Sequence, residues 1–144
     1  MPEDVRTIGS GAFMKCTSLR SISIPSSVVY IKSNAFSGCT NLQVFNMQEG
    51  VLEIESGAFM KCTSLQSISI PSSVVYIGSN VFSGCLKLLE VHFLGKTKDQ
   101  VQTMQRFSWS LKNNTSVICT DGVLIIYNGN TLVKYEGSDE WTEV

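Results

Sequence analysis

Apolar residues recur at a constant spacing along the first two thirds of this 144-residue chain. The spacing in sequence from Ile8 to Ile31 is one such period. This period limits the possible folds more than any other feature. A repeating unit of this length is too short to bury its own apolar face, whereas stacked copies bury a continuous core. The period therefore predicts a solenoid in which each column contacts its own copies. The clearest columns are Ile8, Ile31, Ile54 and Ile77; Phe13, Phe36, Phe59 and Phe82; Cys16, Cys39, Cys62 and Cys85; and Leu19, Leu42, Leu65 and Leu88.

Prolines mark the limits of the repeats. Division at Pro2, Pro25 and Pro71 gives four units over residues 2–93, with Gln48 in place of proline in the third; the units are 2–24, 25–47, 48–70 and 71–93. The second unit illustrates the inward set: Val28, Ile31, Ala35, Phe36, Cys39, Leu42, Phe45 and Met47. Each buried aliphatic or aromatic side chain stabilises a fold by about 1.5–3 kcal/mol, so eight positions per unit strongly favour stacking.

Two extended segments are expected in each unit. The stretch "LRSISIP" at 19–25 alternates apolar and polar residues towards its end, which is typical of a strand with one buried face. Proline then ends the strand because it has no N–H to donate. "SSVVY" at 26–30 predicts a second short strand, and "SNAFSGC" at 33–39 is long enough for a helical turn only.

These patterns resemble the BspA-like leucine-rich repeat. The matching residues are Leu19, Ile22, Ile24 and Pro25, with Ala12-Phe13-Cys16, Ala35-Phe36-Cys39, Ala58-Phe59-Cys62 and Phe82-Cys85; Val81 and "VFNMQ" at 44–48 depart from the pattern. The resemblance covers residues 2 to about 93 and implies a right-handed superhelix of the β-α type, mainly short parallel strands with helical turns. It also implies a surface-exposed or secreted protein of a bacterium or protist, with adhesion as the usual activity.

The period is lost from Leu94 onwards. "TKDQVQTMQRF" at 97–107 predicts a helix, and "SVICT", "VLIIY" and "TLVKY" between 116 and 135 predict a three-stranded meander with a hairpin turn at Asp121-Gly122. Residues 94–136 are thus expected to cap the solenoid, and 137–144 to form an acidic, frayed tail. Because the chain begins on a repeat boundary, we also expect further repeats upstream and self-association through an uncapped N-terminal coil.

Composition excludes several classes of partner. The formal net charge is −1 and the lysines and arginines are scattered, which argues against nucleic acid and anionic membrane surfaces. No apolar run approaches the roughly 20 residues of a membrane span. "MPEDVRT" at 1–7 lacks a signal peptide, so any export signal is expected to lie outside this sequence. The expected partner is a protein, on a host matrix or another cell surface.

No residue pattern indicates catalysis, a metal or a cofactor. The five cysteines form no CxxC pair and are expected to be free, with the four-residue column packed as small apolar side chains. His92, with Glu90 on the same strand face, lacks a positioned nucleophile. "GSG" at 9–11 is too short for a phosphate-binding fingerprint. Asn113 and Asn114 each fit a glycosylation sequon.

The outward positions of the main strand form the candidate ligand-binding surface. This surface consists of Arg20, Ser21, Ser23, Gln43, Asn46, Gln66, Ser67, Ser69, Glu90 and His92, with Tyr30 and Tyr76 beside the second strand as aromatic anchors. The main hypothesis is a non-catalytic binding or adhesion module. An inert spacer that projects another domain is the alternative, and an enzyme is least favoured because no acid–base or nucleophile constellation is present.

Overall fold

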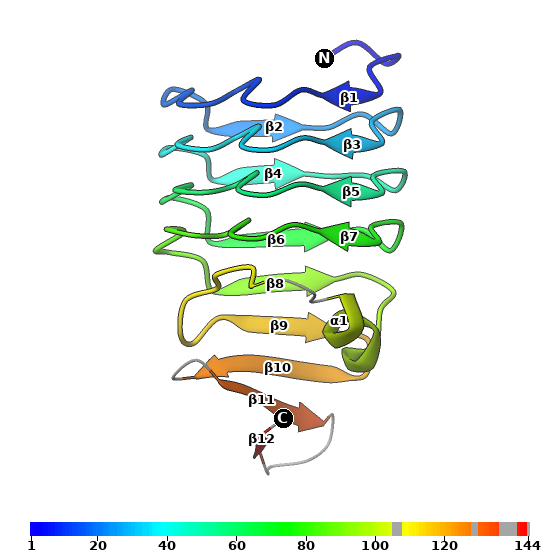
Figure 1. Ribbon diagram of the computed structural model, residues 1–144, viewed down its shortest axis with the longest axis vertical. Coiled ribbons are helices and arrows are strands. Elements are labelled where there is room, and N and C mark those ends of the chain that lie inside the picture. The colour runs from blue at the N-terminus through cyan, green and yellow to red at the C-terminus, as the bar shows by residue number, and fades with distance from the viewer. Residues whose placement is uncertain (105–107, 128–129, 136–140, 144) are drawn as a thin grey trace.

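A computed structural model describes residues 1–104, 108–127, 130–135 and 141–143, and shows a solenoid of stacked parallel strands (Figure 1). One wall is a parallel sheet of four two-residue strands: β1 (Thr7–Ile8), β3 (Tyr30–Ile31), β5 (Glu53–Ile54) and β7 (Tyr76–Ile77). Thr7 pairs with Tyr30, Tyr30 with Glu53 and Glu53 with Tyr76. Residues paired between neighbouring strands of this wall are therefore one repeat apart in the sequence.

The second wall holds the main strands, β2 (Ser21–Ser23), β4 (Val44–Asn46), β6 (Ser67–Ile70) and β8 (Glu90–Phe93). β2 pairs with β4 and β6 pairs with β8, again in parallel and one period apart. β4 and β6, however, belong to different sheets. The second wall is thus interrupted halfway along the solenoid, whereas the first wall is continuous.

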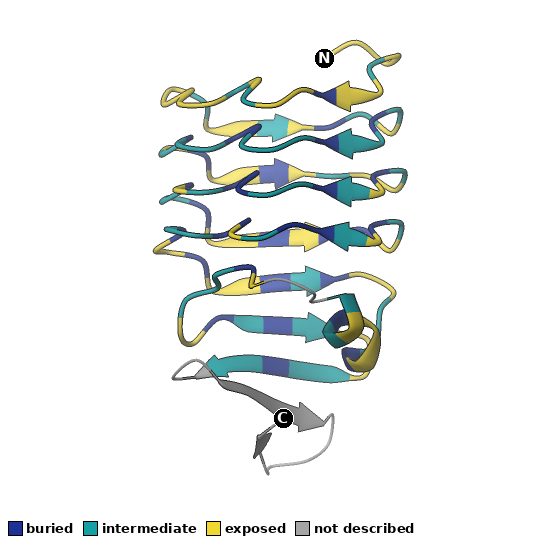
Figure 2. Ribbon diagram, viewed as in Figure 1, coloured by how far each residue is buried: buried dark blue, intermediate teal, exposed yellow. Residues whose placement is uncertain are grey.

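The core lies between the two walls, where the apolar columns meet (Figure 2). Phe13, Phe36, Phe59 and Phe82 stack nearly parallel, with ring centroids 5.0, 5.8 and 6.1 Å apart in chain order. Seven of the eight inward positions expected in the unit 25–47 are buried, and Met47 is half-buried. Packing of like residues on like residues explains why the columns are so regular.

The segments between the walls form hydrogen-bonded turns. In 33–39, Ser37 N donates to Asn34 O and Cys39 N to Phe36 O, while Phe36 N donates to Ala58 O of the next coil. Because alternate amides donate along the solenoid axis, the backbone cannot complete the i to i−4 bonding of a helix. The helical turn expected at this position is a series of turns in the structure.

One column of these turns needs a left-handed backbone. Gly11, Asn34, Gly57 and Asn80 all have φ between 56° and 67°. Glycine and asparagine are the residues that adopt this conformation at least cost. Their alternation along the column follows from this shared requirement.

An ion pair joins two neighbouring coils. Lys32 Nζ donates to Glu55 Oε1 at 2.7 Å, and Glu55 Oε2 accepts bonds from Ser33 N and Oγ, both at 3.1 Å. These interactions, the bond from Lys32 first, hold the pKa of Glu55 below its usual value of 4.5. Their contribution to stability is therefore present above pH 4.5 and is lost as the pH falls through the lowered pKa.

We expect Glu55→Gln to reduce the loss of stability in acid. Because the pair is partly exposed, the substitution should lower the free energy of unfolding at pH 7 by less than about 1 kcal/mol. The difference between the variant and the wild type should shrink as the pH falls below 4.5 and vanish below the lowered pKa of Glu55. Urea denaturation across pH 3–7 measures this, with Glu53→Gln on the same strand as the control; equal pH slopes for all three proteins would contradict the assignment.

Beyond the fourth coil the described residues form the helix α1 (Lys98–Met104) and four strands. β9 (Ser116–Cys119) continues the parallel stacking on β8, whereas β10 (Gly122–Tyr127), β11 (Asn130–Tyr135) and β12 (Trp141–Glu143) follow in antiparallel order. β9 and β10 form the predicted hairpin, but its turn is Thr120-Asp121, one residue earlier than the predicted Asp121-Gly122, because Gly122 already pairs with Cys119. The strand β12 lies within the tail that was expected to be frayed. Of the helix expected at 97–107, residues 105–107 lie outside the described residues.

The first segment after the repeats packs against the last coil. The indole of Trp109 is 1% exposed and stacks on Phe93, with ring centroids 5.4 Å apart. Phe82 N donates to Trp109 O at 3.0 Å, as amides of one coil donate to the next elsewhere. The buried Lys98 connects α1 to the β9–β10 turn, since its Nζ donates to Asp121 O at 3.0 Å.

Candidate ligand-binding surface

The outward side chains of the second wall form one exposed surface, which we call the main-strand face. It consists of Arg20, Ser21, Ser23, Gln43, Val44, Asn46, Gln66, Ser67, Ser69, Leu89, Glu90 and His92. All are exposed except His92, which is half-buried. The parallel register places Ser21 beside Val44 and Ser67 beside Glu90. Ten of the twelve predicted surface residues therefore lie together on one face.

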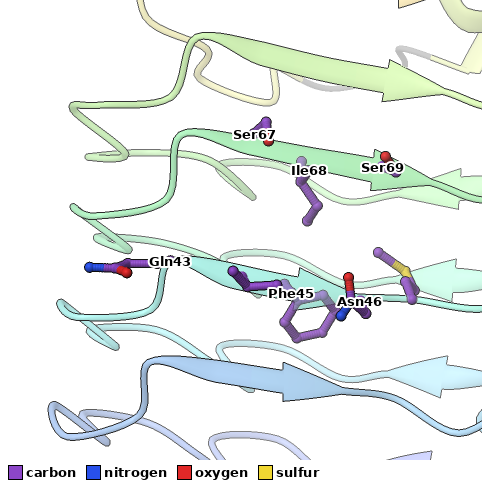
Figure 3. A pocket seen from close by; sticks show the side chains of 8 residues that line it. Gln43, Phe45, Asn46, Ser67, Ile68 and Ser69 are labelled. Atoms are coloured by element: carbon purple, nitrogen blue, oxygen red, sulfur yellow. The ribbon is translucent and has the colours of Figure 1, made fainter.

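A slot of about 190 Å³ opens on this face between β4 and β6 (Figure 3). Its lining combines polar outward residues and apolar inward ones: Gln43, Val44, Phe45, Asn46, Met47, Ser67, Ile68 and Ser69. Ile68 points from β6 into the gap, as Figure 3 shows. The Cα atoms of the two strands still approach within 8 Å. The slot is thus a narrow separation of two strands rather than a missing element.

The slot exists because the ladder between β4 and β6 is not formed. Between β2 and β4, Val44 N donates to Arg20 O and Ile24 N to Asn46 O; between β6 and β8, Glu90 N donates to Gln66 O. The register of these other steps would require Ser67 N to donate to Gln43 O, and Met47 N to Ser69 O. Neither bond occurs in the structure as described for residues 43–70.

Phe45 accounts for the separation. It stands where the other coils have Ile22, Ile68 and Val91, and its larger ring is 5% exposed. The ring lies edge-on to Phe36 and Phe59, with centroids 4.9 and 4.7 Å away. An aromatic ring inserted beside a stack that other coils fill with aliphatic side chains needs extra space. That space is provided at the β4–β6 step.

A second hollow of about 350 Å³ adjoins the slot. It is lined by Gln43, Ser64, Gln66, Ser67 and Lys87, so Gln43 and Ser67 border both cavities. The lining is polar and Lys87 is its one charged residue. The two cavities together form a depression that extends from the second coil to Lys87 of the fourth.

The last coil adds a pair of titratable groups to this face. His92 Nε2 lies 2.8 Å from Glu90 Oε2, and both side chains face solvent in part. The sequence places them on the same side of the strand, and the structure agrees. The pair lies at β8, away from the slot lining.

Tyr30 and Tyr76 lie on the other wall. They belong to β3 and β7, and Glu53 separates them in the ladder. Both are half-buried, and Lys32 Nζ lies 5.0 Å from the centre of the Tyr30 ring. The tyrosines are therefore separate from the main-strand face and cannot contact one small ligand together with it.

The cysteine column is free of disulfides. Cys39, Cys62 and Cys85 are buried, and their thiols donate to the carbonyl oxygens of Phe13, Phe36 and Phe59 at 3.1, 3.3 and 3.0 Å. Burial raises the pKa of all three thiols, that of Cys85 to about 11. Cys16, at the open end of the column, is exposed.

We expect the native protein to be alkylated at Cys16 and protected at Cys62 and Cys85. Because the pKa of Cys85 is about 11, roughly one of its thiols in a thousand is ionised at pH 8. For a thiol with the usual pKa of 9.0 the ionised fraction is about one in ten, so alkylation of Cys85 should be about 100-fold slower. Iodoacetamide labelling at pH 8, followed by peptide mass spectrometry, measures this. Equal labelling of all cysteines in the native protein, as in urea, would contradict the packing.

Metal-binding clusters and membrane-spanning helices are both missing from the described residues. No group of three or more histidine, cysteine, aspartate or glutamate side chains is arranged to hold a metal ion there. In the same part of the chain, no helix has the length and apolar character needed to cross a membrane.

The model of the BspA type leucine rich repeat region matches residues 1–127 in six copies. The chain belongs to this leucine-rich repeat family. The match extends beyond residue 93, where the sequence-based division into four units ends. In the structure, the parallel stacking likewise continues beyond the fourth coil, into β9.

Solved leucine-rich repeat structures are similar to this one. A leucine rich repeat protein of T. pallidum is 33% identical, with a TM-score of 0.63, over 82% of this chain and 49% of that one. A leucine rich cell surface protein of Faecalibacterium prausnitzii is 28% identical, with a TM-score of 0.66, over 90% of this chain and 31% of that one. This leucine-rich repeat chain therefore spans half or less of the length of these relatives. A comparison with curated proteins found no match.

Sequence reasoning missed part of the site. Val44, Phe45, Met47 and Ile68 line the slot, and Ser64 and Lys87 line the adjoining hollow, but none was among the predicted surface residues. The signal was present in "VFNMQ" at 44–48, where this leucine-rich repeat chain lacks the "SISIP" of its first and third coils. A larger inward residue at one coil indicates a local change in strand spacing.

Proposed function

We propose that this leucine-rich repeat chain is a non-catalytic protein-binding module of a cell-surface or secreted protein, and that its main-strand face is the binding surface. The observation that carries the proposal is the depression formed by the slot and the adjoining hollow, both on that face. Exposed polar side chains surround it, and Val44, 47% exposed, gives it an apolar rim. Such a mixed surface suits a protein ligand of modest affinity.

Adhesion to a host matrix or to another cell is the form of binding that the family and a cell-surface relative favour. Leucine-rich repeat domains generally bind proteins, and the extended face of a solenoid offers a long row of side chains for this purpose. The location at the cell surface rests on the relative's description and not on a signal in these 144 residues.

We also propose that residues 94–136 close the C-terminal end of the solenoid. Trp109 covers Phe93, and β9 covers the outer edge of β8. An end covered in this way keeps apolar columns from water and leaves no open edge at β8. Binding partners would then approach the faces rather than this end.

The binding proposal is tested with the immobilised protein and purified matrix proteins or whole cells, by biolayer interferometry. Ser67→Arg with Ser69→Arg places two long charged side chains on the main-strand face and should weaken binding at least about tenfold. Tyr30→Ala with Tyr76→Ala, on the other wall, is the matched pair. Loss of binding only in the tyrosine pair would move the binding surface to the β3–β7 wall.

Two outcomes would reject the proposed function. If no surface protein or cell binds the wild type, the chain is a spacer that projects another domain. A hydrolytic activity that His92→Ala abolishes would indicate an enzyme instead.

A further inference from the structure

We propose that the turn at residues 25–28 binds a carboxylate group, the side-chain group of aspartate and glutamate, presented by a protein partner. The chain has the same sequence, "PSSVVYI", at 25–31 and at 71–77. The turn of the second copy holds the carboxylate of Glu49, whereas no side chain of the described residues fills the turn of the first. The inference goes beyond the proposed function, because this site does not depend on the main-strand face.

The occupied turn, 71–74, shows how the carboxylate is held. Glu49 Oε1 accepts bonds from Ser72 N at 2.9 Å and Ser72 Oγ at 2.8 Å, and Glu49 Oε2 accepts one from Ser73 N at 3.0 Å. These bonds, the one from the Ser72 hydroxyl first, hold the pKa of Glu49 below its usual value of 4.5. Successive backbone N–H groups of a turn form a concave site that suits an anion.

The open turn, 25–28, has the same local geometry. Val28 N donates to Pro25 O at 3.1 Å, and the equivalent bond of the occupied turn is 3.2 Å. Ser27 Oγ donates to a carbonyl oxygen of the preceding coil at 2.7 Å, the same bond and distance as in the occupied turn. The donors Ser26 N, Ser26 Oγ and Ser27 N are therefore arranged in the same way, but no acceptor in the described part of the chain bonds to them.

One residue explains why this turn is open. Glu3 has the same place in sequence relative to the open turn as Glu49 has relative to the occupied one. Glu49 is followed by Gly50, whose φ of 122° lies in the region that favours glycine. Glu3 is followed by Asp4, whose φ is not positive, so the backbone does not direct Glu3 onto the turn. The side chain of Glu3 remains exposed and forms no bond to the serines.

The chemistry of the turn selects a carboxylate. All three groups can donate, and a two-oxygen anion accepts from all of them in the arrangement that Glu49 shows. Such charge-assisted bonds are stronger than those between neutral groups. A carboxamide of the same shape has one acceptor oxygen and would place its own N–H groups against the second backbone donor.

The position of the turn makes it accessible to a partner. The two turns lie at the same edge of the solenoid, where β2 leads to β3 and β6 leads to β7 (Figure 1). Ser26 is exposed to solvent. The exposed carboxylates of Glu3 and Asp4, on the preceding coil, repel another negative charge, so a free carboxylate should bind weakly. A partner that also contacts another part of the protein holds its carboxylate at a high effective concentration.

The probe is N-acetylglutamate α-amide, which presents the Glu49 side chain as a free ligand to the full 144-residue chain. Backbone amide NMR at constant ionic strength should show shifts at Ser26 and Ser27, with half-saturation at about 30–300 mM. The neutral N-acetylglutamine α-amide should shift them at least about fivefold less. The amides of Ser72 and Ser73 should not respond, because Glu49 occupies their turn.

A proline variant removes donors without breaking the turn. The bond from Val28 N to Pro25 O, with no positive φ at Ser26 or Ser27, identifies a type I turn. Because proline is favoured at the second position of such a turn, Ser26→Pro should keep the fold and lose two of the three donors. The shift at Ser27 should then fall at least about fivefold. Ser21→Ala, on β2 outside the turn, should leave it unchanged.

Two further variants exchange the states of the turns. Glu49→Ala empties the occupied turn, so the amides of Ser72 and Ser73 should begin to respond to the probe. Asp4→Gly gives Glu3 the neighbour that Glu49 has, so Glu3 should fill the open turn and abolish its response.

The outcomes separate this inference from the proposed function. No saturable shift at Ser26 and Ser27, or equal shifts with the glutamate and glutamine derivatives, would overturn the inference, even if the protein binds cells through the main-strand face. A response that Ser26→Pro abolishes, and that Glu49→Ala extends to the second turn, would support it. It would do so even if no partner bound the main-strand face.

Discussion

Phe59→Ala is expected to lower the free energy of unfolding by about 3–5 kcal/mol. Phe59 is fully buried between Phe36 and Phe82, and Phe45 meets it edge-on at 4.7 Å. Removal of the ring leaves a cavity that three aromatic neighbours must border. Coils stacked only on nearest neighbours cannot collapse into it without disturbing both adjacent coils.

Phe13→Ala is the matched control, because Phe13 belongs to the same column but is half-buried and stacks only on Phe36. Its loss should be less than half that of Phe59→Ala. Urea denaturation followed by circular dichroism gives both values. Equal losses would indicate that column stacking contributes little, and that the energy lies in contacts within each coil.

Gly78→Ala is expected to destabilise the protein by about 1–3 kcal/mol through overpacking. An added Cβ would lie 2.5 Å from Ser56 N and 2.9 Å from the carbonyl carbon of Glu55. Both are backbone atoms of the preceding coil, so no side-chain rotation relieves the clash. Two coils would have to separate, with loss of the bond from Gly78 N to Ile54 O.

Gly9 provides a sharp comparison, because it occupies the corresponding position of the first coil. An added Cβ there meets no atom within 4 Å. Gly9→Ala should therefore leave stability unchanged or raise it by up to about 1 kcal/mol, since alanine restricts the unfolded chain. The opposite signs at Gly78 and Gly9 can be measured by thermal unfolding. A loss at both positions would refute close coil contact as the cause.

The sequence was sufficient to predict the stacking because the residues that repeat are the buried ones. The columns through Ile31, Phe36 and Leu42 are buried in every coil that the solenoid covers on both sides. Their repetition in the sequence therefore indicates burial. The alternation in "SISI" at 67–70 likewise predicted β6, whose burial alternates residue by residue. Patterns fixed by burial are thus readable without coordinates.

The slot could not be predicted in the same way. Phe45 was expected to point inward, and it does. The pattern of polar and apolar residues predicts the direction of this side chain but not the effect of its size on the spacing of β4 and β6. Tyr30 and Tyr76 were expected beside the second strand of their units; they lie in β3 and β7, and strand pairing shows that these second strands form the other wall. β12 was missed because three residues in an acidic segment carry no periodic signal.

The interruption of one wall has a mechanical consequence for the solenoid. At the level of Phe45, the second and third coils are held together by the β3–β5 wall and by the turns, for example through Leu52 N to Val29 O and Phe36 N to Ala58 O. Because the β4–β6 ladder is absent, this level has fewer bonds between coils than its neighbours, so it can act as a hinge, and bending about the intact wall widens or narrows the opposite side. A tensile load along the solenoid axis would therefore deform the β4–β6 level first, whereas the other coils would stay rigid.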